Sequence, residues 1–226
     1  MNEITKNAQA VEKKVTQQLL SVGQQRLDLE IIVVTKSVSG EETEEIARLG
    51  YRHLAENRPE GLKEKQKLLS GYPITWHYIG SLQRRKVKQV VNSIDYLHSL
   101  DRLSLAEEIE KRAEKEIKCF LQINITGEET KSGLKPEEIS SFLNDIASFQ
   151  KIKVVGLMTM APKDANEKTV RHAFHMLKQL RDETREKSIP NAPCTELSMG
   201  MSQDYLIAIE EGATFVRIGS AFFTNY

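Results

Sequence analysis

The chain has 226 residues, of which 39% are hydrophobic, and its 32 Lys and Arg residues balance 32 Asp and Glu residues to a formal net charge of zero. This length allows one large domain or two small ones with a real core. A balanced charge gives no general electrostatic reason to bind nucleic acid or an anionic membrane. Residues 1–20 lack the apolar core of a signal peptide, and no run approaches the ~20 apolar residues of a membrane span. The two cysteines, Cys119 and Cys194, form no CxxC motif, so we expect free thiols and a cytoplasmic protein.

Helices and strands are predicted to alternate along almost the whole chain. A leading helix over 3–22 carries Ile4, Val11 and Val15 on its apolar side. The predicted strands cover 30–36, 53–57, 75–81, 96–100, 118–125, 152–160, 194–199 and 214–223. The predicted helices between them cover 39–49, 59–69, 83–91, 102–116, a helix opened by Pro136, 167–187 and 203–211. Asp101 is expected to cap the helix over 102–116.

Strict alternation of this kind predicts a parallel sheet. Eight such units in about 200 residues match a closed (β/α)₈ TIM barrel near the small end of its size range. An open doubly wound sheet is the alternative, but it would ordinarily carry GxGxxG after its first strand, where this chain has residues 37–40, Ser-Val-Ser-Gly. We therefore predict a single domain over 1–226, with residues 1–23 as a leading helix packed on the barrel.

The first predicted strand is an apolar, β-branched run that ends in Lys36. The carboxyl ends of strands in α/β folds are where ligands bind. Burial of a lysine favours the neutral amine, which attacks carbonyls to give a Schiff base. The alternative is a lysine that has left the sheet and points into water, since lysine is rarely buried without a partner.

Glycines lie beside hydroxyl side chains at the ends of the last two predicted strands. They are Gly200, between Ser198 and Ser202, and Gly219, followed by Ser220. Small residues let backbone N–H groups approach a phosphate, and phosphate sites in such barrels commonly follow strands seven and eight. Closure of the barrel sets strand eight beside strand one. Lys36 would then face an anion cradle, the layout that pyridoxal 5′-phosphate (PLP) requires, although each turn alone could be an ordinary tight turn.

Side-chain parity adds Arg217 to this arrangement. Alternate residues of a strand share a face, so Lys36 and Arg217 can both point into the barrel mouth. There Arg217 could meet the pyridine nitrogen of PLP and donate a hydrogen bond without readily giving up a proton, which would leave the ring a weaker electron sink. The alternative for Arg217 is an ion pair with a carboxylate such as Glu196.

Several motifs in order then resemble one known family. They are Val34-Thr35-Lys36, Glu56-Asn57, WHYIGSLQ at 76–83, Gln122-Ile123-Asn124 with Lys131-Ser132-Gly133, Gly156-Leu157-Met158, SMGMS at 198–202 and GATFVRIGSA at 212–221. Over about residues 30–223 the chain closely resembles the PLP homeostasis protein family of the YggS/PROSC type. The resemblance implies a fold-type III barrel like the N-terminal domain of alanine racemase, with PLP on Lys36.

The same resemblance assigns roles to further residues. Ser198, Gly200, Gly219 and Ser220 look like the phosphate cradle. Arg217 looks like the partner of the ring nitrogen. Asn57 and His77 look like residues that line the mouth near the ring.

Other features carry weaker predictions. His172 and His175 are three apart on a predicted helix but lack further ligands, so we expect no metal site. The basic turn at 83–88 is expected to be a solvated face, with an anion or phosphorylated-partner site as the alternative. Lys131 could be a second lysine near the mouth or a mobile exposed one.

The first functional hypothesis is a non-catalytic PLP-binding protein that buffers the cofactor, hands it to apo-PLP enzymes and works as a monomer. Racemases with this barrel need a second acid/base group, supplied in the resemblance by a second domain and a partner subunit, and this chain has no residues left for such a domain. The runner-up is a fold-type III racemase that recruits Lys131, His77 or a dimer partner. A third possibility is a Schiff-base aldolase acting on a sugar phosphate.

Overall fold

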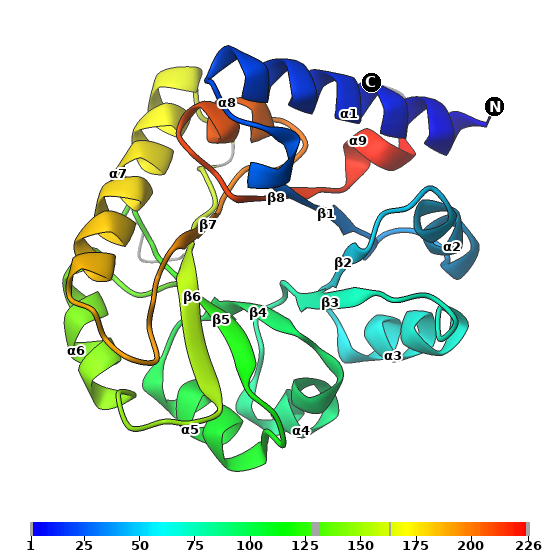
Figure 1. Cartoon of the computed structure of the whole chain (residues 1–226). Coiled ribbons are helices and arrows are strands. Elements are labelled where there is room, and N and C mark those ends of the chain that lie inside the picture. The colour runs from blue at the N-terminus through cyan, green and yellow to red at the C-terminus, as the bar shows by residue number, and fades with distance from the viewer. Residues whose placement is uncertain (1, 128–131, 163, 225–226) are drawn as a thin grey trace.

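The computed structural model describes residues 2–127, 132–162 and 164–224. Eight parallel strands form a closed barrel in the order β1 to β8, with helices around its outside (Figure 1), which confirms the predicted (β/α)₈ fold. The strands are β1 (Glu30–Val34), β2 (His53–Glu56), β3 (Thr75–Tyr78), β4 (Tyr96–Leu100), β5 (Ile117–Gln122), β6 (Ile152–Met158), β7 (Glu196–Ser198) and β8 (Phe215–Ile218). The barrel closes where β1 pairs with β8, with Ile32 opposite Arg217.

The α-helices of the described chain lie between or beside these strands. They are α1 (Glu3–Ser21), α2 (Gly40–Arg48), α3 (Pro59–Leu68), α4 (Val87–Val90), α5 (Leu103–Arg112), α6 (Ile139–Asp145), α7 (Glu167–Glu186), α8 (Tyr205–Glu210) and α9 (Ser220–Phe223). None of the helices in the described part of the chain combines the length and the apolar character that crossing a bilayer requires. Cys119 and Cys194 are buried free thiols.

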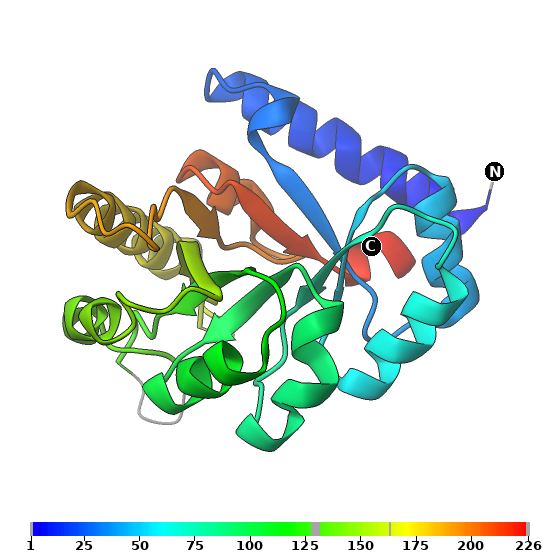
Figure 2. The same ribbon diagram turned by 60° about the horizontal axis from the view of Figure 1, so that its bottom comes forward.

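Local sequence explains where the helices begin. Ser39 accepts a hydrogen bond from the backbone N–H of Glu42 at 3.2 Å, and the Glu42 carboxylate accepts one from the N–H of Ser39 at 2.8 Å. This reciprocal capping box satisfies two otherwise unpaired N–H groups at the start of α2. The leading helix α1 buries Val11, Val15 and Leu19 and lies across α8 and α9, as Figures 1 and 2 show. The leading helix therefore packs on the helical outer layer of the barrel, against α8 and α9.

Several predicted boundaries differ from the structure. Asp101 does not cap α5, because its carboxylate pairs with the guanidinium of Arg102, which itself occupies the N-cap position. The same helix ends at Arg112 because Ala113 is extended, with φ −72° and ψ 133°, which directs the chain into β5. The eighth strand ends at Ile218, and after Gly219 the chain turns into α9.

The core has two parts with different composition. Most buried apolar side chains lie between the strands and the outer helices. Inside the barrel, a smaller apolar cluster consists of Ile32, Ala55, Phe120, Val155, Met158 and Phe215. Interiors of such barrels are ordinarily filled by branched apolar residues. Here His77, His98, Ser198 and Arg217 are also buried, which makes the interior unusually polar.

Candidate functional site

Lys36 lies in the turn that follows β1, at the carboxyl end of the barrel. Its side chain is exposed, and it forms no hydrogen bond or ion pair with any residue that the structure describes. The prediction that a strand carries this amine inward is therefore wrong in detail, because β1 ends at Val34 and the chain has already left the sheet. The amine is free to react with a ligand that reaches it from solvent.

The backbone immediately before Lys36 is firmly anchored. Thr35 is fully buried, and its hydroxyl donates to Glu56 Oε1 at 2.6 Å. Lys65 Nζ, on α3, donates to the carbonyl oxygen of Thr35 and lies 2.6 Å from the same Glu56 oxygen. Lys65 is only 5% exposed, so this ion pair is shielded from water. The pair fixes the point from which the Lys36 side chain projects.

Sequence reasoning missed Lys65, although a signal was present. Leu62, Lys65 and Leu69 recur at spacings of three and four, so Lys65 falls on the apolar face of α3. A lysine on an apolar face requires a carboxylate partner, because an unpaired buried ammonium is strongly disfavoured. Glu56, at the end of β2, is the only acidic residue buried in the described chain.

A cradle of backbone N–H groups lies at the ends of β7 and β8. Ser202 Oγ accepts from the N–H of Gly219 at 3.1 Å and from that of Ala221 at 3.3 Å. Gly200 has φ +92°, and a Cβ atom there would lie 2.6 Å from Ala208 Cβ. Only glycine fits this turn without strain. Two N–H groups converging on one oxygen suit a phosphate oxygen, so these residues fit an anionic group.

The cradle adjoins the strand that leads to Lys36. A Cβ atom on Gly219 would lie 3.3 Å from the carbonyl oxygen of Val34 and 3.4 Å from its Cβ. The register of β1 with β8 continues this contact, since Val33 lies opposite Ile218. The structure thus places Gly219 beside the strand that leads to Lys36, and it brings Gly200 and Ser202 next to the end of β8.

Ser198 lies elsewhere. Its side chain is fully buried inside the barrel, where Ser198 Oγ accepts from Arg217 Nη1 at 2.5 Å. The prediction that its hydroxyl joins the cradle is not met, because β7 ends at this residue with the side chain directed inward. Side-chain parity gave the face of the strand on which Arg217 lies but not its depth in the barrel.

Arg217 is 5% exposed and lies two residues before Gly219 on β8. Besides Ser198, it donates through Nη2 to the carbonyl oxygen of Thr159 at 3.0 Å. It does not pair with Glu196, which instead bonds Thr195. Desolvation lowers the pKa of Arg217 to about 10, an effect that the Asp204 carboxylate opposes. The guanidinium therefore stays charged near neutral pH.

The two predicted mouth residues occupy different levels. Asn57 is half-buried just after β2. A Cβ atom on Gly80 would lie 2.2 Å from the Asn57 carbonyl oxygen, so the segments that follow β2 and β3 are in close contact. His77 is fully buried, and solvent does not reach it. His77 Nδ1 lies 2.9 Å from His98 Nε2, and His77 Nε2 lies 3.0 Å from His53 Nδ1. His77 thus lines the barrel interior and not its rim.

The remaining candidates stay apart from this site. Lys131 lies outside the described residues. His172 and His175 are exposed on α7, where His175 Nδ1 is 3.2 Å from a Glu211 carboxylate oxygen, and the described chain holds no group of three metal-ligating side chains. In the basic turn, Arg84 pairs with Glu108 at 3.7 Å and Lys86 with Glu60 at 3.8 Å. These pairings agree with a solvated, charged face.

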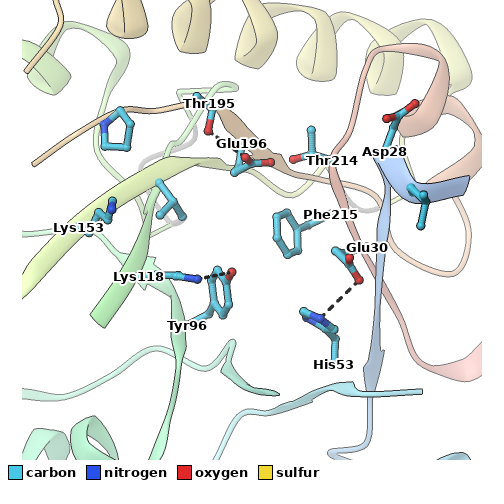
Figure 3. Close-up of a pocket in the computed structure, with 13 residues that line it drawn as sticks. Asp28, Glu30, His53, Tyr96, Lys118, Lys153, Thr195, Glu196, Thr214 and Phe215 are labelled. Atoms are coloured by element: carbon cyan, nitrogen blue, oxygen red, sulfur yellow. Dashed lines mark hydrogen bonds and ion pairs between the residues drawn. The ribbon is translucent and has the colours of Figure 1, made fainter. Parts of the chain in front are cut away.

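A cavity of about 400 Å³ opens at the opposite, amino-terminal end of the barrel (Figure 3). Its lining includes Glu30, His53, Tyr96, Lys118 and Phe215. His53 Nε2 lies 3.5 Å from a Glu30 carboxylate oxygen, and Lys118 Nζ donates to the Tyr96 hydroxyl at 3.2 Å. Sequence reasoning did not identify this cavity, because its residues come from the first positions of strands that are distant in sequence.

Comparisons with known proteins agree with the geometry. The family model described as "Alanine racemase, N-terminal domain" matches residues 3–226. A pyridoxal phosphate homeostasis protein from Aquifex aeolicus is 39% identical over 85% of this chain and 85% of its own length. Another protein of that name, from Helicobacter pylori, is 37% identical over 86% of this chain and 87% of its own.

Solved structures extend these similarities to three dimensions. PipY of Synechococcus elongatus, without PLP, superposes with a TM-score of 0.84 at 31% identity, covering 93% of this chain and 100% of that one. PipY with PLP bound gives a TM-score of 0.82 at 30% identity. Alanine racemase from Corynebacterium glutamicum, at 14% identity and a TM-score of 0.71, covers 95% of this chain but 60% of its own and shows the shared fold alone. The chain therefore belongs to the alanine racemase N-terminal domain family and, within it, to the pyridoxal phosphate homeostasis proteins.

Proposed function

We propose that this protein binds pyridoxal 5′-phosphate at the carboxyl end of its barrel and takes part in PLP homeostasis as a buffer and carrier of the cofactor. Its relatives are named pyridoxal phosphate homeostasis proteins, and PipY has been solved with PLP bound. The observation that carries the proposal is the pair of N–H groups, from Gly219 and Ala221, that converge on one oxygen beside the strand leading to Lys36.

Each part of the site has a role in this proposal. The bound cofactor supplies an aldehyde that condenses with a lysine amine and a phosphate that accepts hydrogen bonds. Lys36 provides the amine, held in place by the anchored Thr35 behind it. Backbone N–H groups at Gly219 and Ala221 hold the anion. Gly200 allows the adjoining turn to form, because a side chain at this position would collide with Ala208. Ser202 Oγ occupies the cradle in the structure, and an anionic oxygen of the cofactor would accept from the same N–H groups.

Arg217 supports a role with little or no catalytic turnover. Its side chain is directed by Ser198 and by the carbonyl oxygen of Thr159, and a guanidinium donates hydrogen bonds while keeping its proton. A ring nitrogen that only accepts a hydrogen bond stays uncharged, and a neutral ring withdraws electrons weakly. Such a site retains the aldehyde without strongly activating an attached amino group.

The wider assignments are part of the same proposal. We infer that the barrel and its leading helix act as one PLP-binding unit, that the protein works as a monomer in the cytoplasm, and that apo-PLP enzymes receive the cofactor. The exposed position of Lys36 supports transfer, since a recipient or competing amine can reach the bond from solvent.

The test is to add PLP to the purified protein and record its absorption spectrum before and after borohydride. We expect a band near 420 nm, as for any lysine-bound PLP, and a reduced product on the peptide that contains Lys36. Lys36→Ala should lose both, whereas the matched control Lys67→Ala, at an exposed lysine of the neighbouring α3, should keep both. A label on other peptides only, or fast α-deuterium exchange of free amino acids, would contradict the proposal.

A further inference from the structure

A continuous line of hydrogen-bonding side chains crosses the barrel interior from the amino-terminal cavity to Arg217. Its members are contributed by β1, β2, β3, β4, β7 and β8 in turn: Glu30, His53, His77, His98, Ser198 and Arg217. We call the inner four, His53, His77, His98 and Ser198, the relay. The last contact within the relay joins His98 Nδ1 and Ser198 Oγ, which lie 2.8 Å apart.

The two ends fix which way the hydrogens point. At the upper end Ser198 Oγ accepts from Arg217, which is charged near neutral pH, so the hydroxyl hydrogen is free to donate to His98 Nδ1. At the lower end the Glu30 carboxylate can only accept, which requires a hydrogen on His53 Nε2. Each histidine in between must therefore accept at Nδ1 and donate from Nε2.

The opposite polarity would leave poor contacts at both ends. His98 Nδ1–H and Arg217 would both donate to Ser198, whose own hydrogen would lose its acceptor at His98. A bare His53 Nε2 lone pair would face the Glu30 carboxylate. Both contacts are unfavourable in a low-dielectric interior, where unpaired polar groups are costly.

Ring stacking holds the relay in register. The His77 ring stacks on Tyr96 with centroids 4.5 Å apart and planes 11° apart. The His98 ring stacks on Phe120 at 4.4 Å and 21°. These contacts restrict rotation of both imidazoles, so their nitrogens stay directed at one another. If the hydrogen of one imidazole moves to its other nitrogen, the neighbouring imidazole must therefore move its hydrogen as well to keep the hydrogen bond between them.

We propose that the relay couples the protonation of His53, at the amino-terminal cavity, to the hydrogen bond that Ser198 forms with Arg217 beneath the PLP site. When one proton is added, His53 carries hydrogens on both nitrogens. His77 and His98 then each carry their single hydrogen on Nδ1 in place of Nε2, and Ser198 keeps its own hydrogen, now turned away from His98. The line therefore holds one hydrogen more than before, which is the proton taken from solution. Ser198 afterwards accepts from both His98 and Arg217.

The positive charge settles at His53 for electrostatic reasons. His53 is the relay member nearest solvent, with 23% of its side chain exposed, and it faces Glu30. The charged groups around it are Glu30 and Asp95, which raise its pKa, and Lys118, which lowers it; burial, the largest effect, also lowers it. Its uncharged neighbours are His77, Tyr96 and the Phe215 ring.

The inner end of the relay is a poor place for that charge. Burial lowers the pKa of His98 well below its usual range, and the charge of Arg217 lowers it further. A proton taken up anywhere along the relay is therefore driven away from Arg217 and toward Glu30. The pH of the solution at the amino-terminal cavity thus affects the hydrogen bonds of Arg217 at the PLP site, through the protonation of His53.

Nitrogen-15 spectra of the histidine side chains test the hydrogen assignment without any cofactor. The chain has five histidines, so single variants assign every signal. Above about pH 7.5 we expect His53, His77 and His98 to be neutral with hydrogens on Nε2. As the pH falls below the ordinary range of histidine, His53 should gain a second hydrogen while those of His77 and His98 shift to Nδ1 at the same midpoint. A hydrogen on His98 Nδ1 at high pH, or inner rings that do not change as His53 titrates, would overturn the proposal.

The coupling to the upper site rests on the proposed function and has its own readout. In the PLP-loaded protein we expect the absorption maximum to shift with the midpoint found for His53. His53→Gln, which keeps a hydrogen-bonding amide but cannot titrate, should abolish the shift, whereas His175→Gln, on the exposed face of α7, should preserve it. A shift that survives in His53→Gln would refute the coupling. Failure to bind PLP at all would instead refute the proposed function and leave the nitrogen-15 result standing.

Discussion

Two buried polar networks support the two halves of the candidate site. One consists of paired charges, whereas the other consists of uncharged hydrogen-bonding groups. Behind Lys36, the Lys65 ammonium and the Glu56 carboxylate are both charged and 2.6 Å apart. Beneath Arg217, the relay is neutral and depends on matched donors and acceptors. Burying a charge requires a partner of opposite charge, whereas burying an imidazole requires only that it remain uncharged.

The difference determines how each network fails. Removal of one member of an ion pair leaves the other charge buried and unpaired, so a single substitution should be severe. A neutral network should tolerate loss of a member better but should be sensitive to acid, which forces charge onto its histidines. Four predictions test this contrast, beginning with the largest effect.

Lys65→Met should lower the free energy of unfolding by about 3–5 kcal/mol, because the Glu56 carboxylate stays buried without a cation. Urea denaturation followed by circular dichroism measures the change. The matched control is Lys67→Met on the exposed side of the same helix, which should change it by less than about 0.5 kcal/mol. Equal effects of the two substitutions would show that the ion pair contributes no more than a surface lysine.

Acid should destabilise the protein through the relay. Burial lowers the pKa of His77 and that of His98 well below the usual range, so the unfolded chain binds protons at these sites below about pH 6.5 when the folded chain does not. This part of the stability is therefore complete above that pH and is lost as the pH falls. We expect the free energy of unfolding to drop by about 2–3 kcal/mol between pH 7 and pH 5.5.

Denaturation midpoints across that pH range measure this dependence. His172→Gln, at an exposed position of α7, should leave its slope unchanged and serves as the control. A free energy of unfolding that is flat or rises as the pH falls to 5.5 would show that the two buried histidines take up protons without penalty.

Ser198→Ala should lower the free energy of unfolding by about 1–3 kcal/mol, because Arg217 Nη1 and His98 Nδ1 each lose a buried partner. It should also uncouple any PLP absorption band from the titration of His53. Ser141→Ala, at an exposed position of α6, is the control and should be nearly neutral. Retention of full stability in Ser198→Ala would mean that water replaces the hydroxyl in the barrel interior.

Lys36→Ala should have the smallest effect on stability, within about 0.5 kcal/mol, since its side chain is exposed and belongs to neither network. The same variant should lose the covalently held PLP. Thermal denaturation together with the absorption spectrum separates the two effects. A large loss of stability would show that Lys36 contributes to the packing of the mouth.

Sequence patterns alone predicted the barrel well, for a physical reason. The alternation of apolar strands with amphipathic helices requires a parallel sheet, and eight units allow it to close. The glycines at 200 and 219 and the lysine at 36 were found because turns and strand ends have local signatures. Element ends were less accurate, as the early end of α5 at Arg112 shows, because the following strand sets that end through tertiary pairing.

What the sequence determined by itself is therefore the fold, the location of Lys36 and Gly219 near the carboxyl ends of two paired strands, and the family resemblance. Only the tertiary structure decided that Lys65 reaches Glu56, that Ser198 lies inside the barrel, and that three histidines align. Side-chain parity gives the face of a strand on which a residue lies but not its depth in the barrel. Depth depends on the stagger between strands, and that stagger arises only when all eight strands close together.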